Sequence, residues 1–304
     1  MAEILETQLE GLKLLKRGKV RDVYEVSPSR LLLVATDRIS AFDVVLPAAI
    51  PQKGAVLTQI SAFWFKKLGV KSHFVAVSPR EVPPEIRETV RGLSGRAMLV
   101  ERAKVYPVEC VVRGYLASSV EKAYRETGAI QGVSLPPGIP LGGKFPKPIF
   151  TPTTKAEAGH DQPLTFPECE ALVGKDVAAR LRDLSLSIFQ KATEHCESRG
   201  LLLADTKFEI GTLPSGEIAL VDEVLTPDSS RFFKKEGHVP GTTPVAFDKQ
   251  VVRDYLNSLP WEKKPPGPPL PPEIVTETAR RYREVYEIVS GRSLDETIRE
   301  IEAK

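Results

Sequence analysis

Residues 201–211, with the segment that follows them, constrain the fold of this chain more than any other part of the sequence. They read LLLADTKFEIG, so charged side chains at every second position alternate with apolar ones. Side chains along a β-strand point alternately to two faces, which places Asp205, Lys207 and Glu209 on one face. A short loop leads into a second strand over 217–224, so the pattern predicts an antiparallel hairpin. A charged face of this kind is, by itself, more typical of a solvated sheet surface than of a site.

Symmetric closure of this hairpin would place Asp205 directly opposite Asp222. Two carboxylates opposite each other repel, so such a pairing favours a cation between them. Mg²⁺ usually takes one or two carboxylates together with substrate phosphates. We therefore predict a Mg²⁺ site at Asp205 and Asp222, with Glu223 as the alternative ligand if a bulge shifts the register. Lys207 would then meet a phosphate.

Residues 17–24, RGKVRDVY, place basic side chains around a glycine at the bend between two strands. Gly18 would let backbone N–H groups approach a phosphate, and Lys19 and Arg21 would supply positive charge. The segment is neither a Walker A sequence nor GxGxxG. An ordinary basic hairpin tip therefore explains it as well as a phosphate site does.

Residues 108–119 run from a strand into a helix. Strand alternation places Glu109 and Arg113 on one face, and the helix opens at Ser118 and Ser119. The N–H groups at the start of a helix attract anions, so a strand-end arginine facing them predicts a phosphate pocket. A plain helix cap at Ser118, with a capping box three residues later, is compatible with the same sequence.

Two further segments concentrate polar residues between apolar runs. Residues 36–43, TDRISAFD, contain Asp37, Arg38, Ser40 and Asp43, which either order a loop among themselves or bind a polar ligand. Residues 226–231, TPDSSR, follow the second strand of the hairpin and end in an arginine. This position favours a ligand loop, while an ordinary turn with an Asx cap is the simpler alternative.

Composition excludes several classes of protein. The chain has 304 residues with 42 Lys+Arg and 40 Asp+Glu, and this near-neutral balance argues against binding nucleic acid. No apolar run approaches the ~18 residues of a membrane helix, and no signal peptide is recognisable. The three cysteines are odd in number and far apart, which fits neither disulfides nor a metal site. We expect a cytoplasmic protein that binds neither nucleic acid nor membrane.

The mixture of strands and helices lacks a regular βαβ rhythm, which indicates an α+β fold. Residues 135–152, rich in Pro and Gly, are predicted to form a long loop. The segment 260–272, PWEKKPPGPPLPP, is predicted to be an extended connector. Apolar residues at helical spacing over 273–289 then predict an amphipathic helix, followed by a last short helix.

Five motifs, taken together and in order, resemble the phosphoribosylaminoimidazole-succinocarboxamide synthase (SAICAR synthetase) family. They are GKVRD at 18–22, TDRISAFD at 36–43, PVECVVRGYLASS at 107–119, ADTKFEIG at 204–211 and LVDEVLTPDSSRF at 220–232. The resemblance extends over about 18–256, and the length matches the single-function form of the family. It implies an ATP-dependent ligase that joins L-aspartate to the carboxylate of carboxyaminoimidazole ribonucleotide (CAIR) in purine biosynthesis.

The resemblance also implies the domain organisation. A β-rich domain resembling a kinase N-lobe, over 1–103, would cover the ATP phosphates. A larger α+β domain similar to ATP-grasp proteins, over 104–258, would hold the metal and CAIR. Residues 259–304 would form a Pro-rich connector and C-terminal helices. The ligands implied are ATP, Mg²⁺, CAIR and L-aspartate, and the choice between monomer and homo-oligomer stays open.

The resemblance assigns roles to residues by motif. The catalytic residues would be Asp205, Lys207 and Lys155, and the metal ligands Asp222 and Asp205. ATP would be bound by Gly18, Lys19, Arg21, Glu101, Lys104, Lys207 and Glu209. CAIR or aspartate would be bound by Ser40, Asp43, Lys53, Arg113, Ser118, Ser119, Lys155, His160, Asp161, Asp228, Ser230, Arg231 and Arg253.

Two alternatives stay open at this stage. A small-molecule kinase with a similar ATP half would phosphorylate a hydroxyl and would not need aspartate, although the chain lacks HRD and DFG motifs. A nucleotide-binding module without catalysis would bind ATP without turning it over. A requirement for aspartate separates the ligase from the kinase, and ATP turnover separates it from the module.

Overall fold

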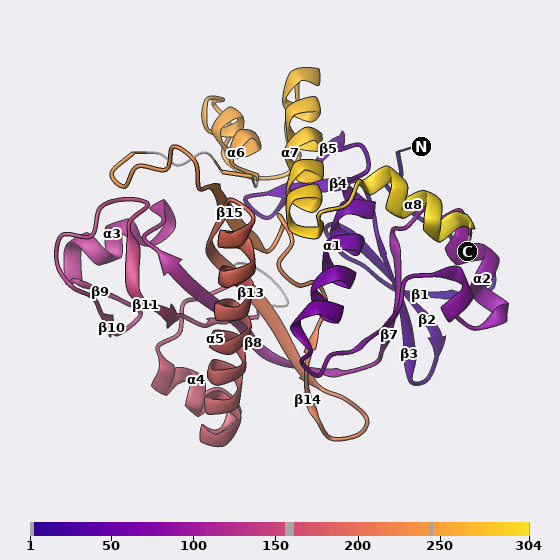
Figure 1. Cartoon of the computed structure of the whole chain (residues 1–304), viewed down its shortest axis with the longest axis horizontal. Helices are drawn as coiled ribbons and strands as arrows, with labels where there is room; N and C mark the ends of the chain where they lie inside the picture. Colours follow the sequence, from indigo (N-terminus) through magenta and orange to yellow (C-terminus); the bar gives the residue numbers. More distant parts are fainter. Residues whose placement is uncertain (1–2, 156–160, 243–245, 248, 304) are drawn as a thin grey trace.

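The computed structural model of the chain describes residues 3–155, 161–242, 246–247 and 249–303. Two larger sheets lie side by side with helix α1 (Lys53–Leu68) between them (Figure 1). Helix α1 contacts strands β3 and β7 of the first sheet on one side and helices α5 and α7 on the other. The mixed architecture confirms the predicted α+β class.

The five-stranded first sheet has the order β1-β2-β3-β7-β6. Its strands are β1 (Lys13–Arg17), β2 (Arg21–Ser27), β3 (Arg30–Ala35), β7 (Ala97–Glu101) and β6 (Phe74–Ala76). All its pairings are antiparallel. The first and second strands meet at Gly18, whose N–H donates a 2.7 Å hydrogen bond to the carbonyl of Arg21.

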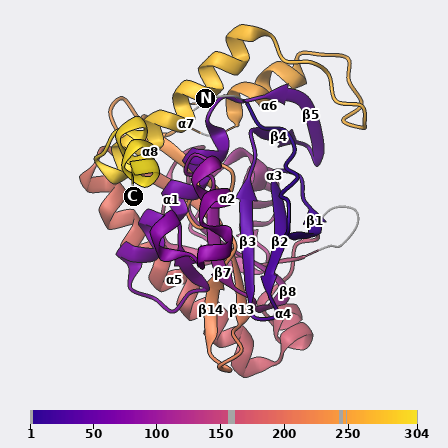
Figure 2. The same cartoon turned by 90° about the vertical axis from the view of Figure 1, so that its right-hand side faces the viewer.

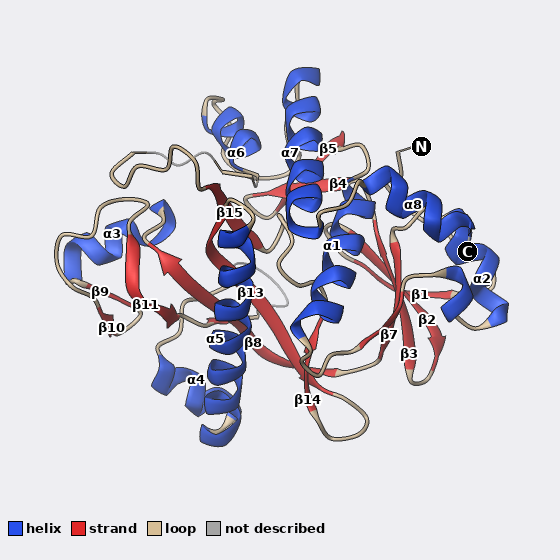
Figure 3. Ribbon diagram, viewed as in Figure 1, coloured by secondary structure: helices blue, strands red, loops and turns tan. Residues whose placement is uncertain are grey.

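The six-stranded second sheet is built around two long strands. Its central order is β11 (Lys144–Phe150), β8 (Lys104–Tyr115), β13 (Leu201–Thr212) and β14 (Ile218–Val221). Strand β12 (Thr153–Thr154) also pairs with β8, and β15 (Ser230–Lys234) with β13. Helices α4 (Phe166–Val173) and α5 (Lys175–Ser198) cover one face of this sheet (Figure 3). The predicted loop over 135–152 is therefore wrong in its second half, which is strand β11.

Two small two-stranded sheets and the remaining helices complete the described chain. The small sheets pair β4 (Arg38–Ala41) with β5 (Val44–Ala49), and β9 (Ala129–Ile130) with β10 (Val133–Ser134). The remaining helices are α2 (Arg87–Gly92), α3 (Ser118–Thr127), α6 (Gln250–Asn257), α7 (Pro272–Ser290) and α8 (Leu294–Ala303). Helix α3 begins after Ala117, without a side-chain cap, so the alternative of Ser118 as a helix cap is wrong. None of the described helices is long and apolar enough to cross a membrane.

One apolar cluster extends through both larger sheets by way of helix α1. It includes Val100 of the first sheet, Trp64 of α1 and Phe208 of the second sheet. A separate cluster joins the β4–β5 hairpin to α6, the Pro-rich connector and α7. These parts lie at the same end of the molecule in both views (Figures 1 and 2). The domain boundaries at 103/104 and 258/259 stay a prediction.

The three cysteines are free and fully buried. Cys110 lies on β8, Cys169 on α4 and Cys196 on α5. Burial raises the pKa of the Cys110 and Cys196 thiols to about 12, so these thiols stay protonated. They pack as small apolar side chains, as the sequence predicted for Cys110.

Candidate active site

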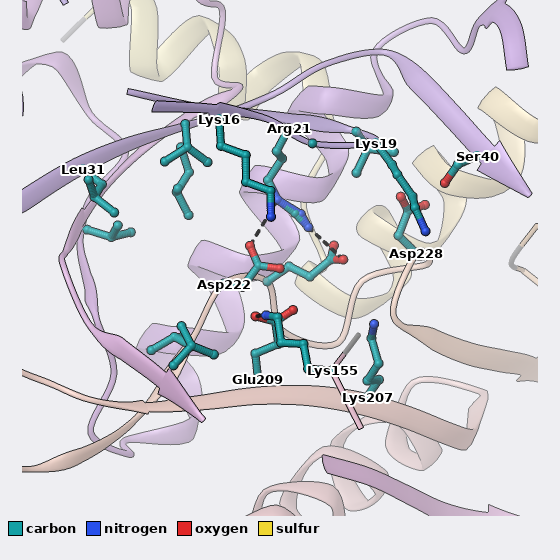
Figure 4. A pocket seen from close by; sticks show the side chains of 18 of the residues that line it. Lys16, Lys19, Arg21, Leu31, Ser40, Lys155, Lys207, Glu209, Asp222 and Asp228 are labelled. Atoms are coloured by element: carbon teal, nitrogen blue, oxygen red, sulfur yellow. Dashed lines mark hydrogen bonds and ion pairs between the residues drawn. The ribbon is translucent and has the colours of Figure 1, made fainter. Parts of the chain in front are cut away.

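Two adjoining cavities lie on the side of the second sheet that faces the first. The first cavity has a volume of about 550 Å³ and opens between the two sheets. Its apolar wall comes mainly from the first sheet, through Val23, Leu31, Leu33 and Val100, and is completed by Ala103 and by Val105 at the start of β8. Its charged floor comes from β13 and the end of β14, where Lys207, Glu209 and Asp222 point into the space (Figure 4).

The second cavity has a volume of about 480 Å³ and is lined mostly by polar residues. Arg113, Ser118 and Ser119 reach it from β8 and the start of α3, whereas Asp205 and Arg231 reach it from β13 and β15. Four residues line both cavities, namely Phe42, Lys207, Asp228 and Arg253. The two spaces therefore meet at a junction formed by these four side chains.

The hairpin of β13 and β14 has a different register from the one predicted. Glu209 pairs with Val221 and Thr212 with Ile218, so the loop spans 213–217 and the register is shifted by three residues from the closure that would face Asp205 with Asp222. Asp205 pairs instead with Arg113 on β8 and Arg231 on β15. The predicted opposition of Asp205 and Asp222 is therefore wrong. The two carboxylates line different cavities.

Asp205 is held by two arginines. Its Oδ2 accepts hydrogen bonds from Arg113 Nη1 at 3.0 Å and from Arg231 Nη2 at 2.6 Å, and its Oδ1 accepts one from Arg231 Nε at 2.9 Å. Burial would raise the pKa of this carboxyl, but the two guanidinium groups outweigh it and keep the pKa below its ordinary value. Asp205 thus stays ionised and fixes two guanidinium groups at the second cavity.

Asp222 lies directly after β14 in a left-handed conformation, with φ of 58°. Arg21 reaches it from the first sheet, with Nε 3.4 Å from Asp222 Oδ1 and Nη2 2.8 Å from a carboxylate oxygen of Glu223 (Figure 4). The ring of His73 is 3.3 Å from the backbone carbonyl of Asp222. These contacts turn the Asp222 carboxylate toward the first cavity. The Arg21 guanidinium group is therefore ion-paired with both Asp222 and Glu223.

The floor of the first cavity carries two ion pairs along β13. Lys155 pairs with Glu209, and Lys207 Nζ donates a 2.6 Å hydrogen bond to Glu109 Oε1. Desolvation raises the pKa of Glu109 to about 7 even though Lys207 acts in the opposite direction. A carboxyl that titrates near neutral pH beside a lysine is typical of a functional site.

A buried cluster lies under the junction of the cavities. Lys53 Nζ donates a 2.7 Å hydrogen bond to Asp228 Oδ2, and the Tyr282 hydroxyl donates one of 2.6 Å to Asp228 Oδ1. Lys249 Nζ lies 3.4 Å from the same carboxylate. Burial lowers the pKa of Lys53 to about 8, and the lysines hold the pKa of Asp228 far below its ordinary value.

Residues 36–43 divide into a pair that orders the loops and a pair that lines a cavity, and ligand binding by the second pair stays a prediction. Asp37 and Arg38 order the loops, because Asp37 pairs with buried Arg96 at 2.8 Å and Arg38 donates hydrogen bonds to the carbonyls of Gly18 and Lys19. Ser40 and Asp43 instead line the first cavity. Arg38 thereby stabilises the glycine bend between β1 and β2 through its backbone carbonyls.

Most of the predicted site residues line one of the two cavities. In the first are Gly18, Lys19, Arg21, Ser40, Asp43, Glu101, Lys155, Lys207, Glu209 and Asp222. In the second are Arg113, Ser118, Ser119, Asp205, Ser230 and Arg231, while Asp228 and Arg253 line both. Lys53 lines neither because it is fully buried, and Lys104 and Asp161 are exposed outside both. His160 lies outside the described residues.

Comparison with known proteins shows the family to which the chain belongs. The family model described as SAICAR synthetase matches residues 14–268. The chain belongs to the SAICAR synthetase family. Its members make SAICAR from CAIR, L-aspartate and ATP, so membership confirms the ATP-dependent ligase of purine biosynthesis that the five motifs indicated.

Individual relatives match over nearly their whole length. A phosphoribosylaminoimidazole-succinocarboxamide synthase of Thermodesulfovibrio yellowstonii is 51% identical over 290 residues, covering 95% of this chain and 99% of that protein. One of Desulfosudis oleivorans is 48% identical over 291 residues, covering 95% and 99%. A solved SAICAR synthase of Saccharomyces cerevisiae, complexed with SAICAR, is 40% identical with a TM-score of 0.85 and covers 95% of this chain and 99% of that one.

Several residues of the two cavities were not predicted as site residues. They include Lys16, Phe42, His73 and Lys249 at the first cavity, and Phe42, Gln250 and Asn257 at the second. Glu109, which lines neither cavity but binds Lys207, was detectable because strand alternation places it on the face of Arg113. His73 gave no signal, because its partner Asp222 lies 149 positions away in the sequence.

Proposed function

We propose that the two cavities divide one ligation between them, with ATP in the first and CAIR in the second. The apolar wall of the first cavity suits adenine, with backbone groups of 101–105 at its edge. Gly18, Lys19 and Lys207 would then lie near the phosphates, and Glu209 near the ribose. The relation to SAICAR synthetases, whose structure with SAICAR has been solved in yeast, supports this division.

The second cavity suits a phosphorylated, anionic substrate. Arg113, Arg231 and Arg253 bring positive charge to it, and the hydroxyls of Ser118 and Ser119 lie at the start of helix α3. Guanidinium groups and helix N-termini are both favourable partners of phosphate. We propose that these groups bind the CAIR phosphate, and that Asp205 orients two of the arginines.

One observation carries the proposal: Lys207 and Asp228 line both cavities. The γ-phosphate of ATP and the carboxylate of CAIR would therefore meet beside the Lys207 ammonium. A carboxylate is a poor electrophile because attack by an amine would have to expel oxide. Transfer of the γ-phosphoryl group to a carboxylate oxygen releases ADP and gives an acyl phosphate with a good leaving group.

The aspartate amine would then attack the acyl carbon, and inorganic phosphate would leave as the amide forms. Positioning and charge neutralisation are the contributions that a protein makes to such a transfer. Lys207 would neutralise charge on the transferred group, assisted by Lys155. Ser40 and Asp43, on the far wall of the first cavity, are the proposed contacts of L-aspartate.

Asp222 is the proposed Mg²⁺ ligand. Its carboxylate faces the first cavity with Glu209 close enough to interact with it electrostatically, and such a donor set fits an ion that takes one or two carboxylates plus phosphate oxygens. When bound, Mg²⁺ neutralises phosphate charge and polarises the γ-phosphoryl group. Arg21 would keep Asp222 oriented for this role through its contact with the carboxylate.

An ADP-release assay with Mg-ATP and CAIR, with and without L-aspartate, tests the proposal. The ultraviolet absorbance of the product is followed in parallel. ADP and SAICAR should appear together and only when aspartate is present. ADP release that ignores aspartate would support the kinase alternative, and ATP binding without any turnover would support the binding module.

A further inference from the structure

The hairpin of β4 and β5 closes with a turn that is unfavourable for its sequence. Ala41 pairs with Val44, so only Phe42 and Asp43 lie between the strands. Both have positive φ, 52° for Phe42 and 63° for Asp43. Two-residue turns with positive φ at both positions favour Asn-Gly, and a bulky side chain at the first position is strained. The turn alone therefore gives no reason for a phenylalanine.

The side chain of Phe42 lies at the junction of the two cavities. Phe42 lines both cavities, together with Lys207, Asp228 and Arg253. It is the apolar member of these four residues in the described part of the chain. An aromatic ring among charged groups, where a phosphoryl group and a carboxylate would meet, displaces water that the charged side chains would otherwise attract.

The Pro-rich connector holds Phe42 from outside the cavities. The rings of Phe42 and Trp261 lie edge to face, with centroids 6.4 Å apart and planes at 64°. Lys263 Nζ lies 4.2 Å from the centroid of the Phe42 ring. The same connector packs with the β4–β5 hairpin and helices α6 and α7 in one apolar cluster. Strain at a site that the surrounding structure fixes in place is typical of a functional position.

We propose that Phe42 shields the junction of the two cavities from water, so that the activated carboxylate of CAIR reacts with aspartate and not with solvent. The competing reaction adds a water oxygen to the acyl carbon and breaks the bond to the phosphate oxygen. It releases CAIR, inorganic phosphate and a proton, so ATP is consumed without forming an amide. This inference rests on the proposed acyl phosphate and assigns Phe42 the task of protecting it.

Phe42→Gly is the decisive substitution, because glycine adopts positive φ without strain and removes the ring. The measured quantity is the ratio of ADP to SAICAR, with and without aspartate, together with the midpoint of thermal unfolding. We expect several-fold more ADP per SAICAR and ADP release without aspartate. The unfolding temperature should fall only modestly, because relief of the turn offsets part of the packing that the ring loses against Trp261.

Ser94→Gly is the matched control. Ser94 also has positive φ, 47°, and lines neither cavity, so the substitution gives similar backbone relief away from the site. Its ratio of ADP to SAICAR should equal that of the wild type. If Phe42→Gly folds poorly, Phe42→Asn, which also tolerates positive φ, takes its place with the same expected excess of ADP.

A one-to-one ratio of ADP to SAICAR in the Phe42 variants, whatever their rate, would overturn the proposal. A lowered unfolding temperature with unchanged coupling would assign the ring a purely structural role. Failure of the proposed function looks different. In that case the wild-type protein itself would form no SAICAR from ATP, CAIR and aspartate.

Discussion

The Tyr282 hydroxyl donates a 2.6 Å hydrogen bond to Oδ1 of Asp228, so helix α7 reaches the junction of the two cavities from beneath it. Lys53 binds the other oxygen of the same carboxylate at 2.7 Å. Both residues are buried, and neither lines a cavity. The C-terminal segment therefore takes part in the site by holding one acidic side chain in place.

Replacing Tyr282 by Phe removes this hydrogen bond and keeps the aromatic ring. A hydrogen bond to a charged group contributes roughly 1.5–3 kcal/mol, so the free energy of unfolding should fall by about that amount. Turnover should also slow, because the Asp228 carboxylate loses one of the hydrogen bonds that fix its orientation. Urea unfolding and steady-state kinetics measure the two effects.

Tyr286→Phe is the control on the same helix. The Tyr286 hydroxyl donates a 2.7 Å hydrogen bond to Thr297, far from both cavities. It should lower stability as well, and leave kcat unchanged. Equal kcat values for the two variants would contradict a positioning role for Tyr282.

Arg113→Ala should raise the KM for CAIR much more than the KM for ATP. The guanidinium group lies at the second cavity, and loss of one charge-assisted hydrogen bond of roughly 1.5–3 kcal/mol predicts an effect of about 10- to 150-fold. Lys19→Ala, at the first cavity, should show the opposite preference. Initial rates with each substrate varied in turn measure both. Equal effects of Arg113→Ala on the two KM values would rule out a separate CAIR pocket.

Asp222→Asn should lower kcat by roughly 100-fold or more while CAIR binding stays close to that of the wild type, because the amide is a weak Mg²⁺ ligand. Calorimetric titration with CAIR and steady-state kinetics over a range of Mg²⁺ concentrations test this. Glu217→Gln changes an exposed carboxylate on the same hairpin and should leave both quantities unaltered. Normal turnover by Asp222→Asn would remove Asp222 from the metal site.

Glu109 should make the protein less stable as the pH rises. Burial raises its pKa from 4.5 to about 7, so between these values the folded protein holds a proton that the unfolded chain has released. The contribution of Glu109 to the free energy of unfolding is full below the lower value and is lost as the pH rises through the upper one. Urea unfolding from about pH 4 to pH 8, a range that brackets this window, measures the slope.

Glu109→Gln removes the titration and should flatten that part of the profile. Gln keeps an oxygen that can accept the Lys207 hydrogen bond, so the contact survives. Glu217→Gln, at an exposed position, should keep the wild-type slope. Parallel profiles for the wild type and Glu109→Gln would show that Glu109 titrates in its ordinary range.

The sequence predicted the chemistry of the site better than its geometry. Strand alternation correctly placed Asp205, Lys207 and Glu209 on one face, because a period of two residues is a local property. It could not predict the pairing register, since the loop at 213–217 shifts β14 by three residues relative to β13 and moves Asp222 away from Asp205. The partners of Asp205 are Arg113, which precedes it by 92 positions, and Arg231 on β15, which follows it by 26.

Contacts between distant segments were beyond the reach of local patterns. Lys53 was expected at a substrate, and burial under helix α7 instead makes it a partner of Asp228. The C-terminal helix over 273–289 was predicted from its apolar spacing, whereas the hydroxyl that Tyr282 directs at Asp228 was not. Proline content also misled the prediction for β11, whose prolines occupy a strand that pairs only along part of its length.

Because all three thiols are buried, their rates of chemical modification measure local opening of the fold. A thiol-reactive dye meets Cys110, Cys169 or Cys196 only when β8, α4 or α5 opens, so the rate at which each is modified reports how often that region exposes its interior. Their burial also leaves the native surface free of reactive sulfur in the described chain. A single cysteine introduced at the bend between β1 and β2 would carry a fluorophore without competition, and its emission would follow that bend as nucleotide arrives.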